Sequence, residues 1–216
     1  EYSQASSRAM MICRSYFTQR SKPLACPCKS RNQFRLFFAK NTPHTTAHFQ
    51  ENCLALSIIF ARSENHCIGY QGLLPWNLPD EFASFNNITD GKAIIMGRRS
   101  YEDHNCALPN RLNIVVSRQL DYTLPAPIRC AANLTTALEL AASHSSEYFI
   151  IGGVKLILAG LSQASRVVET IVHAEVNGDT FLPAIDFSHF KSEIIEHHQV
   201  DEHHASAFTV WQHTRT

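Results

Sequence analysis

Residues 73–85 have the sequence Leu-Leu-Pro-Trp-Asn-Leu-Pro-Asp-Glu-Phe-Ala-Ser-Phe, which predicts a loop leading into a short helix. Pro79 suits the first helical position, because its missing N–H is not needed there and its φ is already set. Asp80 and Glu81 follow in the first turn, where carboxylates complement the helix dipole. The stretch therefore predicts a loop-to-helix junction that carries two carboxylates at its start.

Glu81 lies between aromatic residues in this stretch, and two interpretations stay open for it. Phe82 and Phe85 are three residues apart, so they lie on roughly one helix face, and Trp76 precedes them. If the carboxyl is held beside these rings, desolvation raises its pKa and suits it to proton transfer or to anchoring a cationic, planar ligand. Alternatively, the helix is amphipathic and its acids face solvent.

Length and composition bound the class of protein. A chain of 216 residues has room for one domain of ordinary size plus a tail, and its 44% hydrophobic content supports a core. Seven scattered cysteines, an odd number, do not form a disulfide framework and fit a reducing compartment. No apolar run approaches the length of a membrane span. These features predict a cytoplasmic domain without a membrane partner.

The charge distribution divides the chain near residue 52. Residues 1–52 carry eight Lys and Arg side chains against two acidic ones, whereas the remainder holds 11 basic and 17 acidic side chains. We predict a basic extension at 1–52 without a fold, followed by a domain at 53–216. The extension also fits a mitochondrial transit peptide, a nucleic-acid-binding arm, or an upstream translated stretch preceding Met10 and Met11. Disorder without function is the interpretation we favour.

Two groups of metal-ligating residue types occur in the chain. The Cys-Pro-Cys run at 26–28 has no second Cys or His pair at zinc spacing. The His-His pairs at 197–198 and 203–204 flank a predicted turn at 201–202. Adjacent histidines on a strand point to opposite faces, so we expect one of each pair to be solvated. We predict no metal site.

Strands and helices alternate along the domain. Strands are predicted at 54–61, 92–96, 113–116, 128–131, 147–151, 167–176, 190–198 and 205–212. Helices are predicted from 79, from 98, over 135–143 with Asn133 or Thr135 as N-cap, and over 154–161. This order predicts an α/β fold with helices on both faces of a central, mainly parallel sheet of about eight strands and an antiparallel C-terminal edge.

Several predicted strand ends carry groups that suit phosphate binding. They are Gly97 with Arg98, Arg99 and Ser100; Ser117 with Arg118; and Gly152 with Gly153. Backbone N–H groups at a helix start, together with cations and hydroxyls, bind phosphate at such ends. The alternative is a capped surface helix with two solvated cations. The Gly-Gly pair is a weak signal alone, because it lacks the G-x-G-x-x-G pattern.

Six short motifs follow one another in a fixed order. They are Ile68-Gly69, Leu74-Pro75-Trp76, Met96-Gly97-Arg98, Leu108-Pro109-Asn110-Arg111, Ile151-Gly152-Gly153 and Gly178-Asp179-Thr180. Each is common singly, but in this order and spacing they resemble the dihydrofolate reductase family over residues 53–213. The resemblance implies that family's three-layer α/β fold.

The resemblance implies NADPH-dependent reduction of 7,8-dihydrofolate to tetrahydrofolate, with a hydride passing to pterin C6 while N5 gains a proton. Glu81 would bind the pterin amino group and N3 and support N5 protonation through water, with Thr170 bracing its carboxylate and Trp76 beside it. Arg111 would clamp the α-carboxylate of the glutamate tail, a task that suits a guanidinium fork. Antifolates are implied ligands, and the product would serve one-carbon metabolism and thymidylate and purine synthesis.

The family pattern also implies the remaining contacts. Further substrate contacts are Ile59, Phe60, Phe82, Phe85, His104, Leu108 and Ile151. NADPH contacts are Ala61, Ile68, Gly69, Gly72 and Leu73 beside the nicotinamide and ribose; Gly97, Arg98, Arg99, Ser100, Ser117 and Arg118 around the phosphates; and Gly152, Gly153, Val154, Lys155 and Leu156 as backbone donors. Residues 69–74 would be a mobile lid.

Two positions depart from the family pattern. Ile157 stands where the family usually carries a tyrosine near the nicotinamide, and His104 occupies a usually apolar position facing the benzoyl group. Both departures bear on turnover and antifolate sensitivity.

Two rival functions stay open. One is the NADPH-dependent pyrimidine reductase of riboflavin synthesis, and the other is a non-catalytic NADPH- or RNA-binding module. For the domain itself we expect a monomer with no nucleic-acid partner.

Overall fold

Runs of buried aliphatic residues build the central sheet. The computed structural model describes residues 55–104, 107–119 and 121–216. Within them, eight strands form one sheet in the order β5-β4-β3-β6-β1-β7-β10-β9. Their bounds are β1 Ala55–Ser63, β3 Ala93–Gly97, β4 Leu112–Val116, β5 Arg129–Ala131, β6 Glu147–Gly152, β7 Arg166–Val172, β9 Phe190–His198 and β10 Phe208–Arg215.

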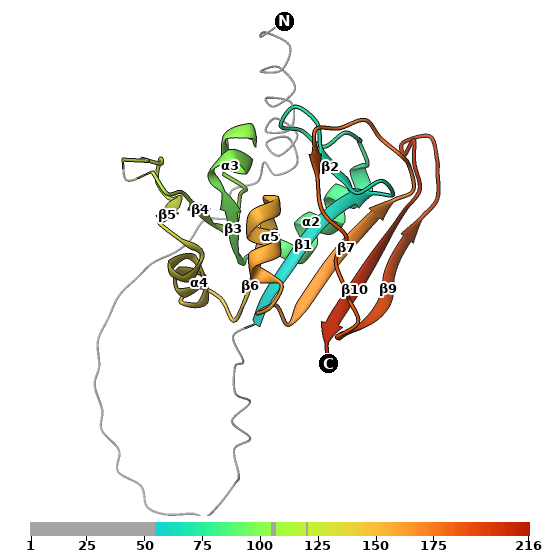
Figure 1. Ribbon diagram of the computed structural model, residues 1–216. Coiled ribbons are helices and arrows are strands. Elements are labelled where there is room, and N and C mark those ends of the chain that lie inside the picture. Colours follow the sequence, from blue (N-terminus) through green and yellow to red (C-terminus); the bar gives the residue numbers. More distant parts are fainter. Residues whose placement is uncertain (1–54, 105–106, 120) are drawn as a thin grey trace, which may run out of the picture. The chain divides into compact units, whose positions relative to one another are not determined.

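Strand β1 lies at the centre of this sheet. It pairs in parallel with β6 on one side and β7 on the other. Strand β3 continues the parallel pairing from β6 to β4, and β4 pairs with β5. Strand β10 runs antiparallel to both β7 and β9, and β9 is the outermost strand at this edge of the sheet (Figure 1). The predicted mainly parallel sheet with an antiparallel C-terminal edge is confirmed.

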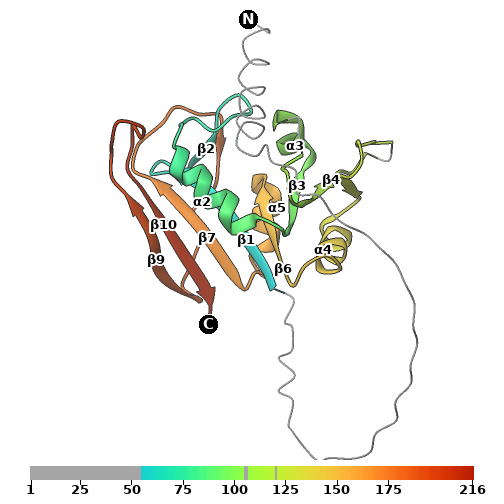
Figure 2. The same ribbon diagram turned by 180° about the vertical axis from the view of Figure 1, so that it is seen from behind.

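Among the described residues, four helices cover the two faces of the sheet. They are α2 Pro79–Thr89, α3 Arg98–His104, α4 Leu134–Ala142 and α5 Val154–Gly160. Side chains of α4 and α5 join one buried cluster, which contains Ile58 and Ile150. Side chains of α2 and α3 pack against a second cluster, which contains Ile59 and Phe149. Figures 1 and 2 show α5 crossing one face and α2 the other, so the fold has three layers.

Helix starts follow local chemistry. Asn133 is the N-cap of α4, since its side chain accepts a hydrogen bond of 2.9 Å from the backbone N–H of Thr136. This observation decides between the two predicted caps. Helix α2 begins without a side-chain cap and relies on Pro79 at its start.

The bounds of two strands, β7 and β10, were predicted wrongly. Strand β7 ends at Val172 instead of residue 176, because the N–H of Ala174 donates to the Val172 carbonyl over 2.8 Å and the chain turns. Strand β10 begins at Phe208, three residues later than predicted, and extends to Arg215. A small sheet of β2 (Cys67–Gly69) and β8 (Thr180–Phe181) was not predicted, because strands this short carry no period-two pattern.

Within the described ranges, no helix is long and apolar enough to cross a membrane. The predicted extension at 1–52, with its Cys-Pro-Cys run, lies outside the described residues. Its interpretations stay predictions.

Candidate active site

Glu81 is buried on the side of α2 that faces the sheet. Its side chain comes from the first turn of the helix, and the residue is only 7% exposed. Its carboxyl meets the hydroxyl of Thr170, which lies mid-sheet because β7 pairs there with Ala61 of β1 and Val210 of β10. Of the two interpretations of Glu81, the buried carboxyl is the one observed.

Burial changes the acidity of Glu81. Desolvation raises its pKa from 4.5 to about 7, and the negative charge of Glu196 adds to the rise, while the hydrogen bond with Thr170 opposes it. The carboxyl therefore changes protonation state near neutral pH. That property suits a group that takes up and releases a proton during catalysis.

Apolar side chains form the surroundings of Glu81. Ile59 of β1 belongs to the cluster on this face, and Trp76, Phe85, Leu108 and Ile151 pack against it. The rings of Phe82 and Phe85 are nearly parallel, at 19°, with centroids 6.4 Å apart. The face thus offers flat apolar surface beside one ionisable carboxyl.

Phe60 does not belong to this surface. Its side chain lies in the cluster under α4 and α5, on the opposite face of the sheet from Ile59. Successive residues of a strand point to opposite faces, so both cannot line one site. The prediction of a substrate contact from the Phe60 side chain is wrong.

Two buried nitrogen atoms near this face lack a partner. Among the described residues, the indole Nε1 of Trp76 and the Nε of Arg111 are the buried side-chain atoms without a hydrogen bond. Arg111 is otherwise fixed, since its Nη2 donates to the backbone and side-chain oxygens of Asn86 at 3.0 and 2.9 Å and its Nη1 to the Pro109 carbonyl at 3.1 Å. Its guanidinium also lies 6.0 Å from the Phe85 ring centroid. Unpaired buried donors are costly, so both atoms suit an incoming acceptor.

Glycines keep open the junction between β3, β6 and the helices that follow them. Gly152 has a φ of +153°, and a Cβ on Gly153 would lie 3.2 Å from the hydroxyl oxygen of Ser100. A Cβ on Gly97 would lie 3.7 Å from the backbone nitrogen of Gly153. The peptide bond between Gly152 and Gly153 is cis. Side chains here would cover the backbone N–H groups at the start of α5.

Some of the side chains predicted to bind phosphate already have a hydrogen-bond or ion-pair partner, and others do not. Arg98 forms an ion pair with Glu102 at 2.8 Å. Arg99 and Arg118 are exposed, and neither makes a hydrogen bond or ion pair with any described residue. Ser117 is buried, and its hydroxyl oxygen accepts from the backbone N–H of Gln119 over 3.2 Å. The two free arginines are therefore the cations most open to an anion.

Among the backbone N–H groups predicted to bind phosphate, one is already hydrogen-bonded within α5 and others are not. The N–H of Leu156 donates to the Gly153 carbonyl over 2.9 Å inside α5, so its prediction as a phosphate donor is wrong. The N–H groups of Gly153, Val154 and Lys155 precede the helical ladder, where such groups have no intrahelical partner.

The predicted lid is tied to a neighbouring turn. The N–H of Gln71 donates to a carboxylate oxygen of Asp179 over 2.7 Å, and the N–H of Asp179 donates to the Gly69 carbonyl over 3.1 Å. The bond from Gln71, together with one from the Thr180 hydroxyl, holds the pKa of the Asp179 carboxyl below its usual value. Tyr70 and Leu73 exchange backbone hydrogen bonds, and Gly72 lies against Asp103 of α3. In this structure the loop is held close to α3.

Of the two positions that depart from the family pattern, the structure describes the side chain of Ile157 but not that of His104. Ile157 is 2% exposed and belongs to the cluster under α4 and α5, where it fills core volume. The side chain of His104 lies outside the described residues, so its predicted role is not examined by the structure.

The fold and this site define an α/β enzyme, and comparison with known proteins gives its family. The family model for dihydrofolate reductase matches residues 55–215. Dihydrofolate reductase from Neisseria meningitidis serogroup A is 42% identical over 139 residues, which are 64% of this chain and 85% of that protein. The enzyme from Bacillus subtilis is 37% identical over 147 residues, 68% of this chain and 86% of that protein.

A solved structure agrees with these relatives. Dihydrofolate reductase from Enterococcus faecalis, complexed with NADP(H) and RAB-propyl, superposes with a TM-score of 0.72 at 28% identity. The match covers 76% of this chain and 98% of that one. The chain belongs to the dihydrofolate reductase family and is an oxidoreductase.

Proposed function

We propose that this enzyme reduces 7,8-dihydrofolate to 5,6,7,8-tetrahydrofolate with NADPH. The observation that carries the proposal is Glu81, a carboxyl buried beside Thr170 and apolar rings with a pKa of about 7. Its relatives are named dihydrofolate reductases, and the Enterococcus faecalis structure holds NADP(H). The product would serve as the carrier of one-carbon units for thymidylate and purine synthesis.

The glycine-lined junction fits NADPH. Gly97, Gly152 and Gly153 leave backbone exposed where side chains would intrude, and Arg99 and Arg118 are free cations for phosphate. When bound, NADPH supplies the hydride that reduces pterin C6. The chain's own part is to orient the dinucleotide through these groups and to exclude water with residues 69–74.

Glu81 would assist the protonation of pterin N5. Its carboxyl would hydrogen-bond the amino group and N3 of the pterin, while Phe85 and Ile59 pack on the rings. The proton that N5 receives comes from solvent, and a protonated Glu81 favours its delivery through a water in the site. The unpaired indole N–H of Trp76 suits an acceptor such as that water.

Isotope transfer tests the proposal. With NADPH deuterated at nicotinamide C4 and dihydrofolate as acceptor, we expect deuterium at C6 of tetrahydrofolate by mass spectrometry and NMR. The ribosylamino-pyrimidine of riboflavin synthesis should give no product. Deuterium transfer to that pyrimidine, and none to dihydrofolate, would contradict the proposal in favour of the riboflavin-pathway reductase.

The pH dependence of turnover is expected to follow Glu81. Because the protonated form is needed, the rate should fall about tenfold per pH unit above pH 7. Thr170→Val removes the hydrogen bond that lowers this pKa, so the fall should move to higher pH. Thr209→Val is the matched control, since the Thr209 hydroxyl is buried in the sheet but bonds His173 at 2.8 Å. Identical profiles for wild type and Thr170→Val would contradict the assignment.

The free arginines are expected to select the phosphorylated cofactor. Arg99→Ala and Arg118→Ala should each weaken NADPH binding about tenfold, roughly 1.4 kcal/mol, while leaving NADH binding nearly unchanged. Fluorescence titration of each variant with both cofactors measures the difference. Lys191→Ala, an exposed cation on the far edge strand β9, is the control. Equal weakening of both cofactors would count against a phosphate contact.

A further inference from the structure

Two histidines and an aspartate converge between the first turn of α2 and the turn that joins β9 to β10. His198 ends β9, His204 follows in the turn toward β10, and Asp80 lies in the first turn of α2. The Nε2 atom of His198 is 2.9 Å from Asp80 Oδ2, and the Nε2 atom of His204 is 3.7 Å from the same oxygen. The three ligand atoms lie within 4.8 Å of one another.

Hydrogen bonds fix both imidazole rings in one tautomer. Nδ1 of His198 is 2.7 Å from the Gln199 carbonyl oxygen, and Nδ1 of His204 is 2.8 Å from Asp201 Oδ1. Both partners, a backbone carbonyl and a carboxylate, accept hydrogen bonds. Each Nδ1 therefore carries the proton.

This arrangement leaves the Nε2 atom of each histidine facing Asp80. The Nε2 atom of His204 is an acceptor, because the backbone N–H of Asp80 donates a hydrogen bond to it over 3.1 Å. For His198, an Nε2 lone pair 2.9 Å from a carboxylate oxygen needs a proton or a cation between them. Histidine metal ligands commonly donate their other N–H to a carbonyl or carboxylate in this way.

We propose that Asp80, His198 and His204 form a binding site for a divalent transition-metal ion of the zinc type. Two imidazole nitrogens and one carboxylate oxygen are a ligand set that such ions favour. Ligand bonds of about 2.0 to 2.2 Å in a tetrahedron separate the donor atoms by roughly 3.3 Å. The observed separations of 2.9 and 3.7 Å from Asp80 Oδ2 lie on either side of that value.

Asp201 offers the fourth ligand. Its Oδ2 is 3.6 Å from His198 Nε2, while its other oxygen holds the His204 ring. A water would take this position if Asp201 remains in its orienting role. Either way the site carries two carboxylates, whose charge favours a divalent cation.

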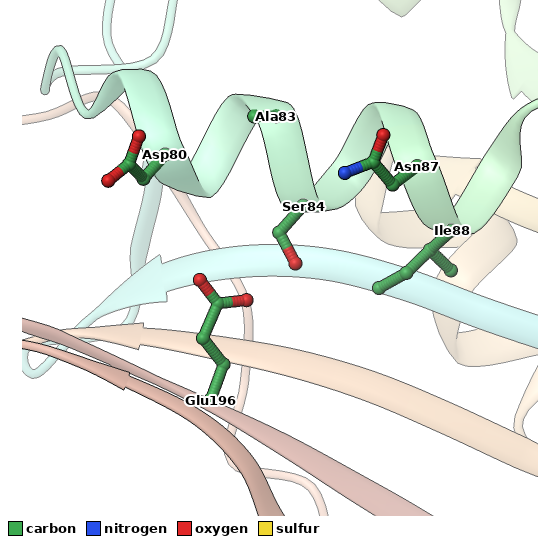
Figure 3. A pocket seen from close by; sticks show the side chains of 6 residues that line it. All are labelled: Asp80, Ala83, Ser84, Asn87, Ile88 and Glu196. Carbon is green, nitrogen blue, oxygen red and sulfur yellow. The ribbon is translucent and has the colours of Figure 1, made fainter.

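The site is open to solvent on one side. The side chains of Asp80 and Asp201 are 55% and 42% exposed, whereas that of His204 is 3% exposed. A pocket of about 260 Å³ lies next to Asp80, between α2 and Glu196 of β9 (Figure 3). An ion therefore has an entry path, and one wall of its site is buried.

Metal binding at this position would join distant parts of the chain. It would fasten the β9–β10 turn to the first turn of α2, immediately before Glu81. The backbone N–H of Asp80 would exchange its bond to His204 for solvent, which is a small cost at a helix start.

Titration of the metal-stripped full chain with Co²⁺ and Zn²⁺ tests the site. Co²⁺ should give the visible d–d bands of a tetrahedral ion, which are stronger than those of aqueous Co²⁺, without the intense near-ultraviolet band of a thiolate ligand. His198→Gln and Asp80→Asn should each weaken Zn²⁺ binding by at least tenfold in calorimetry. His203→Gln is the matched control, because that side chain is 71% exposed and lies outside the cluster.

Thermal unfolding supplies a second measurement. Zn²⁺ should raise the Tm of wild type and His203→Gln but not that of His198→Gln, because an ion that binds only the native state stabilises it. Three results would overturn the proposal: no saturable binding by wild type, unchanged Zn²⁺ affinity in His198→Gln, or a cobalt spectrum accounted for entirely by thiolates.

Discussion

Replacing Glu81 by glutamine is expected to lower the turnover of dihydrofolate by about 10² to 10⁴-fold at pH 7, the usual contribution of a positioned proton-transfer group. The amide keeps the shape of the side chain and its place beside Thr170, but it does not ionise and so cannot act as an acid or base near pH 7. NADPH affinity should stay within about twofold, because the glycine-lined junction is built from other elements. Single-turnover kinetics and cofactor titration measure the two effects separately.

The same substitution should stabilise the fold at alkaline pH. The folded protein holds the Glu81 proton up to about pH 7, whereas the unfolded chain releases it near pH 4.5. Native stability therefore falls as pH rises between these values, by up to about 3 kcal/mol. Glutamine removes that cost, so Glu81→Gln should resist urea better than wild type at pH 8 and similarly at pH 4. Equal loss of turnover and of cofactor binding would instead indicate misfolding.

Replacing Arg111 by leucine is expected to weaken dihydrofolate binding by roughly 30- to 1,000-fold, about 2 to 4 kcal/mol. The guanidinium is held against α2 by Asn86, and its buried Nε lacks an acceptor among the described residues. A carboxylate from the substrate's glutamate tail would complete its bonding. Equilibrium titration of the variant with dihydrofolate measures the loss.

A substrate without the tail provides the control for Arg111. A dihydropterin that ends before the glutamate should bind wild type and Arg111→Leu with similar affinity. Arg111→Lys should recover only part of the dihydrofolate affinity, because an ammonium cannot pair with both carboxylate oxygens as a fork. Unchanged dihydrofolate affinity in Arg111→Leu would contradict the assignment of Arg111 to the carboxylate of the glutamate tail.

Much of the fold could be predicted from local patterns in the sequence. Buried aliphatic runs such as 92–96 and 113–116 are strands because both of their faces are covered by helices. Pro79 and Asn133 mark helix starts through backbone chemistry that acts within a few residues. The burial of Glu81 was one of two open interpretations, because spacing shows which residues share a helix face but not what covers that face.

Other features depend on contacts between distant segments. Phe60 was predicted to contact the substrate together with Ile59. Neighbouring residues of a strand point to opposite faces of the sheet, so the sequence alone could have excluded this pairing. The end of β7 is set by a turn whose carbonyl at Ala174 accepts from the N–H of Glu64. The sequence also predicted no metal site. It predicted that one histidine of each pair would be solvated, whereas the contact between Asp80 and His198 depends on how α2 packs on the sheet.

The measurement that tests the central claim most directly follows the near-ultraviolet absorbance of NADPH mixed with dihydrofolate and the full chain. The wild-type enzyme should oxidise NADPH only when dihydrofolate is present, and Glu81→Gln at equal concentration should do so at least 100-fold more slowly at pH 7. An absence of folate-dependent oxidation by wild type that still binds NADPH would contradict the account, as would an equal rate in Glu81→Gln.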